Sequence, residues 1–249
     1  MTEAVPPVQE VAFTIGIDGA PGFTVLDLAA LHALFEDDFP EFQEAHPLPS
    51  MVLGPPSSQT HTFTLGPTPP RVWFISSDLR WLIQIQNDRI ALNWRHVGDQ
   101  PGQTPYPGFA QIQDRFFKVL ARFTAWFADK WGQSPTFGIA ELTYVDVIPM
   151  EKSPGEFARI SEIFAFYNAT RGAVPIADFT ASWGEPIGEP HDPIGWTIVE
   201  AKSGVSTNYG LSAFLQTSGR KHVSGSAPSP EWFRELHERA VAIYQSLIK

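Results

Sequence analysis

The chain contains no cysteine, and this absence removes several kinds of chemistry at once. Without thiols there is no disulfide, no thiolate metal ligand and no cysteine nucleophile. Long apolar runs are also missing, because no window approaches the roughly 18 consecutive apolar residues of a membrane-spanning helix. The first residues, 1–7, lack the basic start and apolar stretch of a signal peptide. We therefore expect a cytoplasmic protein that has no membrane partner.

Basic residues are scarce at the start of the chain. The first is Arg71, and nine acidic residues precede it. The whole chain has a formal net charge of -10 and a pI of about 5.1. A surface of this sign repels nucleic acids and anionic membranes. The charge argues against a nucleic-acid partner and leaves two interpretations open, a solvated acidic surface or a docking surface for a basic protein.

Apolar residues are plentiful enough for a folded core. Hydrophobic residues make up 43% of the 249 positions and aromatic residues 13%. A chain of this length forms one large domain or two of ordinary size. We expect most of the aromatic rings to lie in the core, where they bury large areas.

The clearest local pattern is a β-hairpin over 80–95. A two-residue turn at Asn87-Asp88 places three apolar pairs on one face and polar residues on the other, because side chains alternate along a strand. The apolar pairs are Ile85 with Ile90, Ile83 with Leu92, and Trp81 with Trp94. The polar face pairs Gln86 with Arg89, Gln84 with Ala91, Leu82 with Asn93, and Arg80 with Arg95.

Two long amphipathic helices are predicted. The first covers 109–131 and ends at Gly132, with an apolar stripe formed by Phe109, Ile112, Phe116, Leu120, Phe123 and Phe127. The second runs from about Glu231 to Leu247, with Pro230 suited to its start. Further expected elements are strands at 11–17, 139–148, 176–183, 196–200 and 211–217, helices at 26–35 and 156–167, and a loop at 47–70 with a short strand at 61–65.

The order of elements repeats, which predicts an α+β fold with two similar halves, 1–132 and 133–249. Each half would be an antiparallel sheet with a long C-terminal amphipathic helix, and the two would pack as one compact unit. The two closing helices share the spacing of Phe, aliphatic, acid and Arg at an offset of 124, as in Phe109 to Arg115 and Phe233 to Arg239. This similarity indicates an internal duplication.

Several short motifs resemble a sporadically distributed family of bacterial and archaeal proteins of about this length. They are Pro6 to Val11, Phe35 to Phe42, Asn93-Trp94-Arg95, Tyr106 to Phe109 and Leu142 to Asp146. The resemblance covers about Pro6 to Met150. Family members tend to have Arg-Tyr-x-Asn where this chain has Thr143-Tyr144-Val145-Asp146. The family has no assigned activity, so the resemblance implies a prokaryotic, cytoplasmic protein and transfers no catalytic residue.

Motifs for common chemistries do not occur in the sequence. The seven histidines form no i, i+4 pair and no His-Glu-x-x-His run, and phosphate-binding glycine loops and a Gly-x-Ser-x-Gly elbow are missing as well. We therefore assign no catalytic residue, metal ligand or cofactor. Whether the protein is an enzyme stays open, with a non-catalytic role preferred.

An acidic and aromatic segment is the first candidate site. In it, Phe35, Phe39 and Phe42 would anchor a basic protein partner while Glu36, Asp37 and Asp38 steer it. The alternative interpretation is a solvated helix end.

The polar face of the hairpin is the second candidate site. Arg80 opposite Arg95 is unfavourable unless an acid or an anionic ligand compensates them. Internal carboxylates would make this face structural. Otherwise the face would bind a phosphate or carboxylate group through Arg80, Gln84, Gln86, Arg89, Asn93 and Arg95.

These observations favour a non-catalytic binding protein, in the manner of an antitoxin or immunity protein that holds a basic partner. The alternative is an enzyme or small-anion receptor with an arginine-lined pocket on the 80–95 hairpin face and a histidine nearby.

Overall fold

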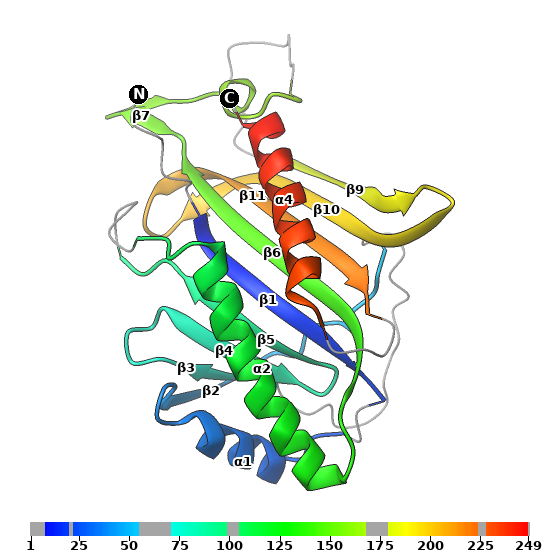
Figure 1. Cartoon of the computed structure of the whole chain (residues 1–249). Coiled ribbons are helices and arrows are strands. Elements are labelled where there is room, and N and C mark those ends of the chain that lie inside the picture. Colours follow the sequence, from blue (N-terminus) through cyan, green and yellow to red (C-terminus); the bar gives the residue numbers. More distant parts are fainter. Residues whose placement is uncertain are drawn as a thin grey trace.

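The described part of the fold is organised around one nine-stranded antiparallel sheet (Figure 1). This computed structural model describes residues 8–19, 22–54, 71–98, 105–167, 179–223 and 228–248. The strand order across the sheet is β2-β3-β4-β5-β1-β6-β11-β10-β9. The strands are β1 (Val8–Asp18), β2 (Glu41–Ala45), β3 (Arg71–Ile75), β4 (Trp81–Gln86), β5 (Arg89–Arg95), β6 (Thr136–Pro149), β9 (Thr180–Glu189), β10 (Asp192–Ser206) and β11 (Gly210–His222).

Two long helices, α2 (Phe109–Trp131) and α4 (Pro230–Leu247), lie across the same face of this sheet (Figure 1). The shorter α1 (Val25–Phe35) packs near the β3 side of the sheet and beside α2. A small hairpin of β7 (Glu151–Ser153) and β8 (Glu156–Phe157) and the one-turn helix α3 (Ile160–Ile163) lie beyond the end of β6.

The ends of the long helices follow from local sequence, as predicted. Gly132 takes a left-handed conformation with φ of 68°, and its N–H donates to the Ala128 carbonyl to close α2. Ser229 caps α4 by accepting a hydrogen bond from the Glu231 N–H, and Pro230 occupies the first turn. Both helix predictions are confirmed.

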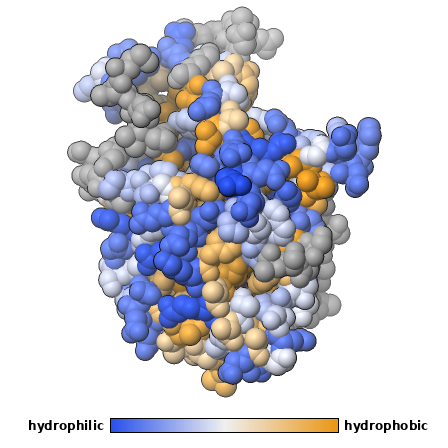
Figure 2. Space-filling model, in the orientation of Figure 1, coloured by the Kyte–Doolittle hydropathy of each residue, from blue (hydrophilic) through white to orange (hydrophobic). Residues whose placement is uncertain are grey.

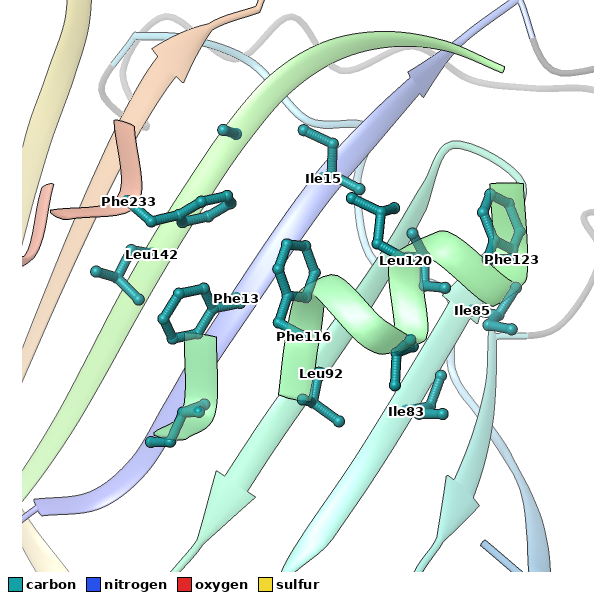
Figure 3. Packing of buried hydrophobic residues seen from close by; sticks show 14 of the residues in the cluster. Phe13, Ile15, Ile83, Ile85, Leu92, Phe116, Leu120, Phe123, Leu142 and Phe233 are labelled. Carbon is teal, nitrogen blue, oxygen red and sulfur yellow. The ribbon is translucent and has the colours of Figure 1, made fainter. Parts of the chain in front are cut away.

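The core lies between the helices and the sheet (Figure 3). Phe13 of β1 is fully buried, and its ring centroid lies 5.0–5.5 Å from those of Phe109, Phe116 and Phe233. Gly219 on β11 lets α4 approach this closely, because a Cβ there would lie 2.8 Å from the Leu236 side chain. Burial of these rings supplies the main favourable term for folding.

The predicted hairpin is confirmed in its register. Trp81 pairs with Trp94, Ile83 with Leu92 and Ile85 with Ile90. These side chains are buried on the face that the helices cover. The turn residues therefore set the register, and the register sets which side chains reach each face.

The prediction of two repeated halves, each with its own sheet, is wrong. Strand β6 pairs along most of its length with β1, so a single sheet continues across the expected boundary at 132/133. This pairing leaves neither β1 nor β6 as an edge strand, and exposed edges are a liability in β-proteins. Sequence patterns identified many of the elements but carried no information about which distant strands pair.

Some local predictions also need correction. The region expected as a helix at 156–167 holds strand β8 and only the short α3. Strands β2 and β3 were not expected. Of the strand expected at 176–183, residues 176–178 lie outside the described residues and β9 begins at Thr180. The possible strand at 61–65 also lies outside the described residues.

The helix-covered side of the molecule presents a mostly hydrophilic surface with apolar patches between the polar areas (Figure 2). Within the described ranges, no helix is both long and apolar enough to cross a membrane.

Candidate ligand-binding sites

The face of the sheet away from the long helices carries a polar pocket of about 220 Å³, which we call the polar-face pocket. Its floor is formed by the small residues Ala12, Thr14 and Ala91, which lie beside one another on β1 and β5. Longer side chains surround this floor. They are Glu10, Leu48, Arg71, Gln84, Gln86, Arg89, Asn93, Glu141, Thr143, Val145 and Gln216.

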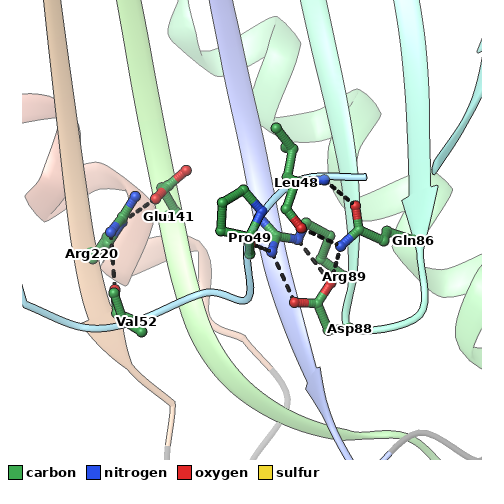
Figure 4. Close-up of polar contacts among 8 residues, drawn as sticks. All are labelled: Leu48, Pro49, Val52, Gln86, Asp88, Arg89, Glu141 and Arg220. Atoms are coloured by element: carbon green, nitrogen blue, oxygen red, sulfur yellow. Dashed lines mark hydrogen bonds and ion pairs between the residues drawn. The ribbon is translucent and has the colours of Figure 1, made fainter. Parts of the chain in front are cut away.

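The segment that follows β2 crosses part of this face and binds it through backbone groups (Figure 4). Gln86 accepts a hydrogen bond from the Leu48 N–H at 2.8 Å and donates one to the Leu48 carbonyl at 2.9 Å. Arg89 donates to the Pro49 carbonyl and forms an ion pair with Asp88 at 2.8 Å. These predicted ligand-binding side chains are thus engaged within the protein.

Further charged groups on this face also have partners within the protein. Arg220 of β11 forms an ion pair with Glu141 of β6 and donates to the Val52 carbonyl at 3.0 Å (Figure 4). Asn93 donates to the Glu10 carboxylate and accepts a hydrogen bond from Gln84 at 2.8 Å. Burial nevertheless raises the pKa of Glu10 above its ordinary value.

The six residues predicted to form an anion site do not all come together. Four of them, Gln84, Gln86, Arg89 and Asn93, line the polar-face pocket, whereas Arg80 and Arg95 do not. Arg80 lies 3.8 Å from Asp78, and Arg95 donates to the Leu79 carbonyl at 3.0 Å. Arg80 therefore has an internal acid beside it and Arg95 a backbone carbonyl, but the buried Nε atom of Arg95 has no hydrogen-bond partner within the described residues.

Arg71 is the cation of this pocket that sequence reasoning missed. It donates to Gln84 at 3.0 Å, but its Nε atom is buried and has no hydrogen-bond partner within the described residues. Burial and the neighbouring Arg89 both lower the pKa of Arg71, while Glu10 opposes this effect. Only the pairing of β3 with β4 brings Arg71 next to Gln84, and β3 was not expected.

The acidic and aromatic segment is less available for docking than its sequence indicated. Phe35 and Phe39 are buried in the core, and only Phe42 is exposed, at 45%. Glu36, Asp37 and Asp38 are exposed.

Basic residues of α2 lie beside these acids. Arg122 forms an ion pair with Asp38 at 3.2 Å, and its guanidinium lies 4.8 Å from the Phe35 ring centroid. Arg115 and Lys118 line a surface groove together with Asp38 and Arg122. The local surface therefore has mixed charge, which weakens the attraction that a basic partner would feel.

A second pocket, which we call the helix-side pocket, opens between α4 and the sheet and has a volume of about 270 Å³. Apolar walls come from Val8, Ala240 and Val241, and tyrosine rings complete much of the lining. The lining residues are Val8, Tyr106, Tyr144, Asp146, Thr217, His237, Ala240, Val241, Tyr244 and Gln245.

Asp146 supplies the carboxylate of this pocket. It sits on β6 between Val8 of β1 and Leu215 of β11, and only 4% of its surface is exposed. Within the described part of the chain, its carboxyl group has no hydrogen-bond donor and no basic partner. Burial raises the pKa of Asp146 to about 7, because the charged form loses hydration without compensation.

Tyr144 and His237 form a hydrogen bond across the pocket, with 2.7 Å between Tyr144 Oη and His237 Nδ1. The His237 ring also stacks on Phe109, with centroids 4.3 Å apart. Burial raises the pKa of Tyr144 and lowers that of His237, so both side chains are neutral near pH 7. These contacts hold the imidazole in a fixed orientation.

Two further hydroxyl groups in the pocket lack partners. The Tyr106 hydroxyl lies close enough to Tyr144 to influence its pKa, but it makes no hydrogen bond of good geometry within the described residues. Thr217 on β11 pairs with Tyr144 on the neighbouring strand β6 and is buried. Its Oγ1 atom also has no hydrogen-bond partner within the described residues. Buried hydroxyls without partners cost roughly 1–3 kcal/mol each, so such groups require an explanation.

Sequence reasoning did not identify this pocket. Tyr106 and the run 142–146 were noted only as resemblance motifs, and His237 sits in an ordinary amphipathic helix. Alternation along β6 does place Tyr144 and Asp146 on one face, yet an acid on an apolar face is a weak signal by itself. The convergence of three strands, a helix and a loop is what forms the site.

Comparisons with known proteins add no identification. No protein-family model matches the chain, and no curated protein matches it. The family resemblance therefore stays a prediction. Over the ranges that the structure describes, no three His, Asp or Glu side chains gather closely enough to hold a metal ion.

Proposed function

We propose that this protein binds a small organic molecule in the helix-side pocket. The observation that carries the proposal is the set of unpaired polar groups around one cavity, namely the Asp146 carboxyl and the hydroxyls of Tyr106 and Thr217. A mostly apolar cavity with a few convergent polar groups and a perturbed pKa is typical of ligand sites. A ligand that supplies the missing hydrogen bonds would stabilise the folded state.

Binding rather than catalysis is favoured by the state of Tyr144. Its raised pKa keeps the hydroxyl protonated, and the hydrogen bond to His237 occupies it. A protonated phenol is a poor nucleophile and a good hydrogen-bond group. This supports a receptor or carrier role.

The proposal can be tested by ligand-observed NMR with a library of small aromatic and aliphatic fragments. The matched variants are Val241→Trp, which places an indole at the wall of the pocket, and Val205→Trp at an 81% exposed position on β10 outside it. We expect some fragments to bind the wild-type protein and Val205→Trp but not Val241→Trp. Equal binding to both variants would place those fragments elsewhere.

A second candidate function is a small-anion site in the polar-face pocket, favoured by the buried, unpaired Nε of Arg71. An anion there would also offset the repulsion between Arg71 and Arg89. Titration with inorganic phosphate and with acetate tests this function. Arg71→Gln should abolish binding, whereas Arg80→Gln, outside the pocket, should not.

The docking of a basic protein stays a prediction with weaker support. Two of its three aromatic anchors are buried, and Asp38 is already paired with Arg122. Hot spots in interfaces are usually aromatic side chains that a partner can reach.

A further inference from the structure

The charge balance of the helix-side pocket indicates the chemistry of its ligand. The titratable side chains that line it are Tyr106, Tyr144, Asp146, His237 and Tyr244. The three tyrosines are neutral at pH 8, since the pKa of each is raised, that of Tyr244 to about 12. His237 is also neutral there, because burial lowers its pKa although Glu238 on the same helix opposes this. The one charge left within the described lining is the Asp146 carboxylate.

All three unpaired groups can accept a hydrogen bond, and the two hydroxyls can also donate one. The Asp146 carboxylate accepts hydrogen bonds and cannot donate them, and the hydroxyls of Tyr106 and Thr217 can both accept. An ammonium group has three N–H donors and no acceptor. It therefore matches these three groups in charge and in hydrogen bonding.

Other head groups fit less well. A carboxylate or phosphate would be repelled by Asp146. A neutral alcohol would leave the charge of the Asp146 carboxylate without a counterion. A divalent metal ion prefers several oxygen ligands, often carboxylates, and this lining supplies a single carboxylate.

The remainder of the pocket suits a short apolar body. Val8, Ala240 and Val241 give apolar walls, and the rings of Tyr106 and Tyr144 can add cation–π attraction to the head group. The volume of about 270 Å³ equals that of roughly nine waters at about 30 Å³ each, which suits a molecule the size of phenethylamine.

We infer that the helix-side pocket binds a protonated primary amine carried on a short apolar body, with Asp146 as its counterion and the hydroxyls of Tyr106 and Thr217 as further acceptors. This inference rests on the proposed function, because it names the ligand class of the same pocket.

The test is isothermal titration of the full chain with three molecules of similar shape: phenethylamine, the neutral 2-phenylethanol and the anionic phenylacetate. Butylamine and benzylamine extend the amine series. At pH 8 we expect the best amine to bind at least about tenfold more tightly than the alcohol, which corresponds to about 1.4 kcal/mol. Phenylacetate should not bind.

The pH dependence provides a second readout. Only the ionised form of Asp146 binds the ammonium group, so apparent affinity scales with the ionised fraction. With the Asp146 pKa at about 7, amine binding should weaken roughly 30-fold between pH 8 and pH 5.5. Protonation of His237 at the lower pH would act in the same direction, and the alcohol should show little change.

Isosteric variants assign the effect to individual groups. Asp146→Asn should weaken amine binding at least about tenfold without weakening alcohol binding, since it removes the charge and keeps the shape. Tyr106→Phe and Thr217→Val should weaken amine binding several-fold. The control is Thr197→Val, because the Thr197 hydroxyl is also buried and unpaired within the described residues but does not line the pocket.

The outcomes separate the inference from the proposed function. If the alcohol binds as tightly as the amines, and Val241→Trp blocks it, the pocket binds small molecules but the amine inference is wrong. If no amine of the series binds, the inference is overturned, and the fragment experiment then decides the function independently. Amine binding that survives both Asp146→Asn and Val241→Trp would locate it outside this pocket.

Discussion

The two faces of the central sheet differ in how their buried charged groups are partnered. On the polar face, Glu141 is paired with Arg220, Arg89 with Asp88, and Gln86 with the backbone of Leu48. Around the helix-side pocket, Asp146 and two hydroxyls have no partner in the described structure. Arg71 and Arg95 on the polar face each keep a buried Nε atom without a partner within the described residues, although their other guanidinium atoms donate to Gln84 and to the Leu79 carbonyl. Groups that the protein satisfies itself stabilise the fold, whereas groups left unsatisfied lower its stability until a ligand completes them.

The difference also changes how charge should be interpreted. The richest polar cluster in the sequence, the hairpin face, is largely compensated from inside the protein. The pocket that lacks compensation contains a single carboxyl group. The number of charged residues is therefore a weaker indication of a ligand site than one buried charge without a partner.

The largest expected effect is a gain in stability on replacing Asp146. A folded-state pKa of about 7, against an ordinary value of 3.8, means that ionisation of Asp146 opposes folding as pH rises from about 4 through 7. Asp146→Asn should raise the free energy of unfolding by roughly 2–4 kcal/mol at pH 8 and change it little at pH 4. Urea denaturation at both pH values measures this, with the exposed Asp114→Asn as control.

A variant that is no more stable than wild type at pH 8 would contradict the difference between the two faces. It would mean that the Asp146 carboxylate is compensated after all.

The next largest effect is a loss of stability when an ion pair on the polar face is broken. Arg220→Met leaves the Glu141 carboxylate, which is 16% exposed, without its counterion and should lower the free energy of unfolding by about 3 kcal/mol. The double variant Glu141→Gln/Arg220→Met should recover more than half of this loss. Chemical denaturation of the full double-mutant cycle gives the coupling between the two residues. A single-variant cost no larger than that of the exposed Arg80→Met would show that the pair is not needed.

A smaller gain is expected from the unpaired threonines. Thr217→Val and Thr197→Val should each stabilise the ligand-free protein by about 1 kcal/mol, because a methyl group replaces a buried hydroxyl without a partner. Thermal melts followed by circular dichroism measure both. Destabilisation by Thr217→Val alone would indicate that its hydroxyl already has a hydrogen-bond partner.

The smallest effect is expected at the acidic segment. Asp38 and Arg122 form an exposed ion pair, and such pairs contribute between zero and about 1 kcal/mol. Asp38→Asn should change the free energy of unfolding by less than about 0.5 kcal/mol, and added salt should reduce the difference further. A larger change that persists in high salt would place Asp38 among the buried, paired charges.

The sequence by itself determined the local elements where a periodic pattern and its end signals agreed. The apolar stripe of α2 with Gly132 after it, the Pro230 start of α4 and the register of the 80–95 hairpin all follow from residues close together in the chain. It failed at 156–167, where the Ala165 N–H donates to the Leu247 carbonyl and Phe164 pairs with Ile248 in place of a continued helix.

Only the tertiary structure decided which strands join and therefore which polar groups meet. Pairing of β1 with β6 replaced two expected sheets by one, and this same pairing brings Val8 beside Asp146. Packing of α4 then adds His237 to Tyr144, at a sequence separation of 93 residues. Such contacts depend on the free energy of the whole core rather than on local propensity, so residues close in sequence do not predict them.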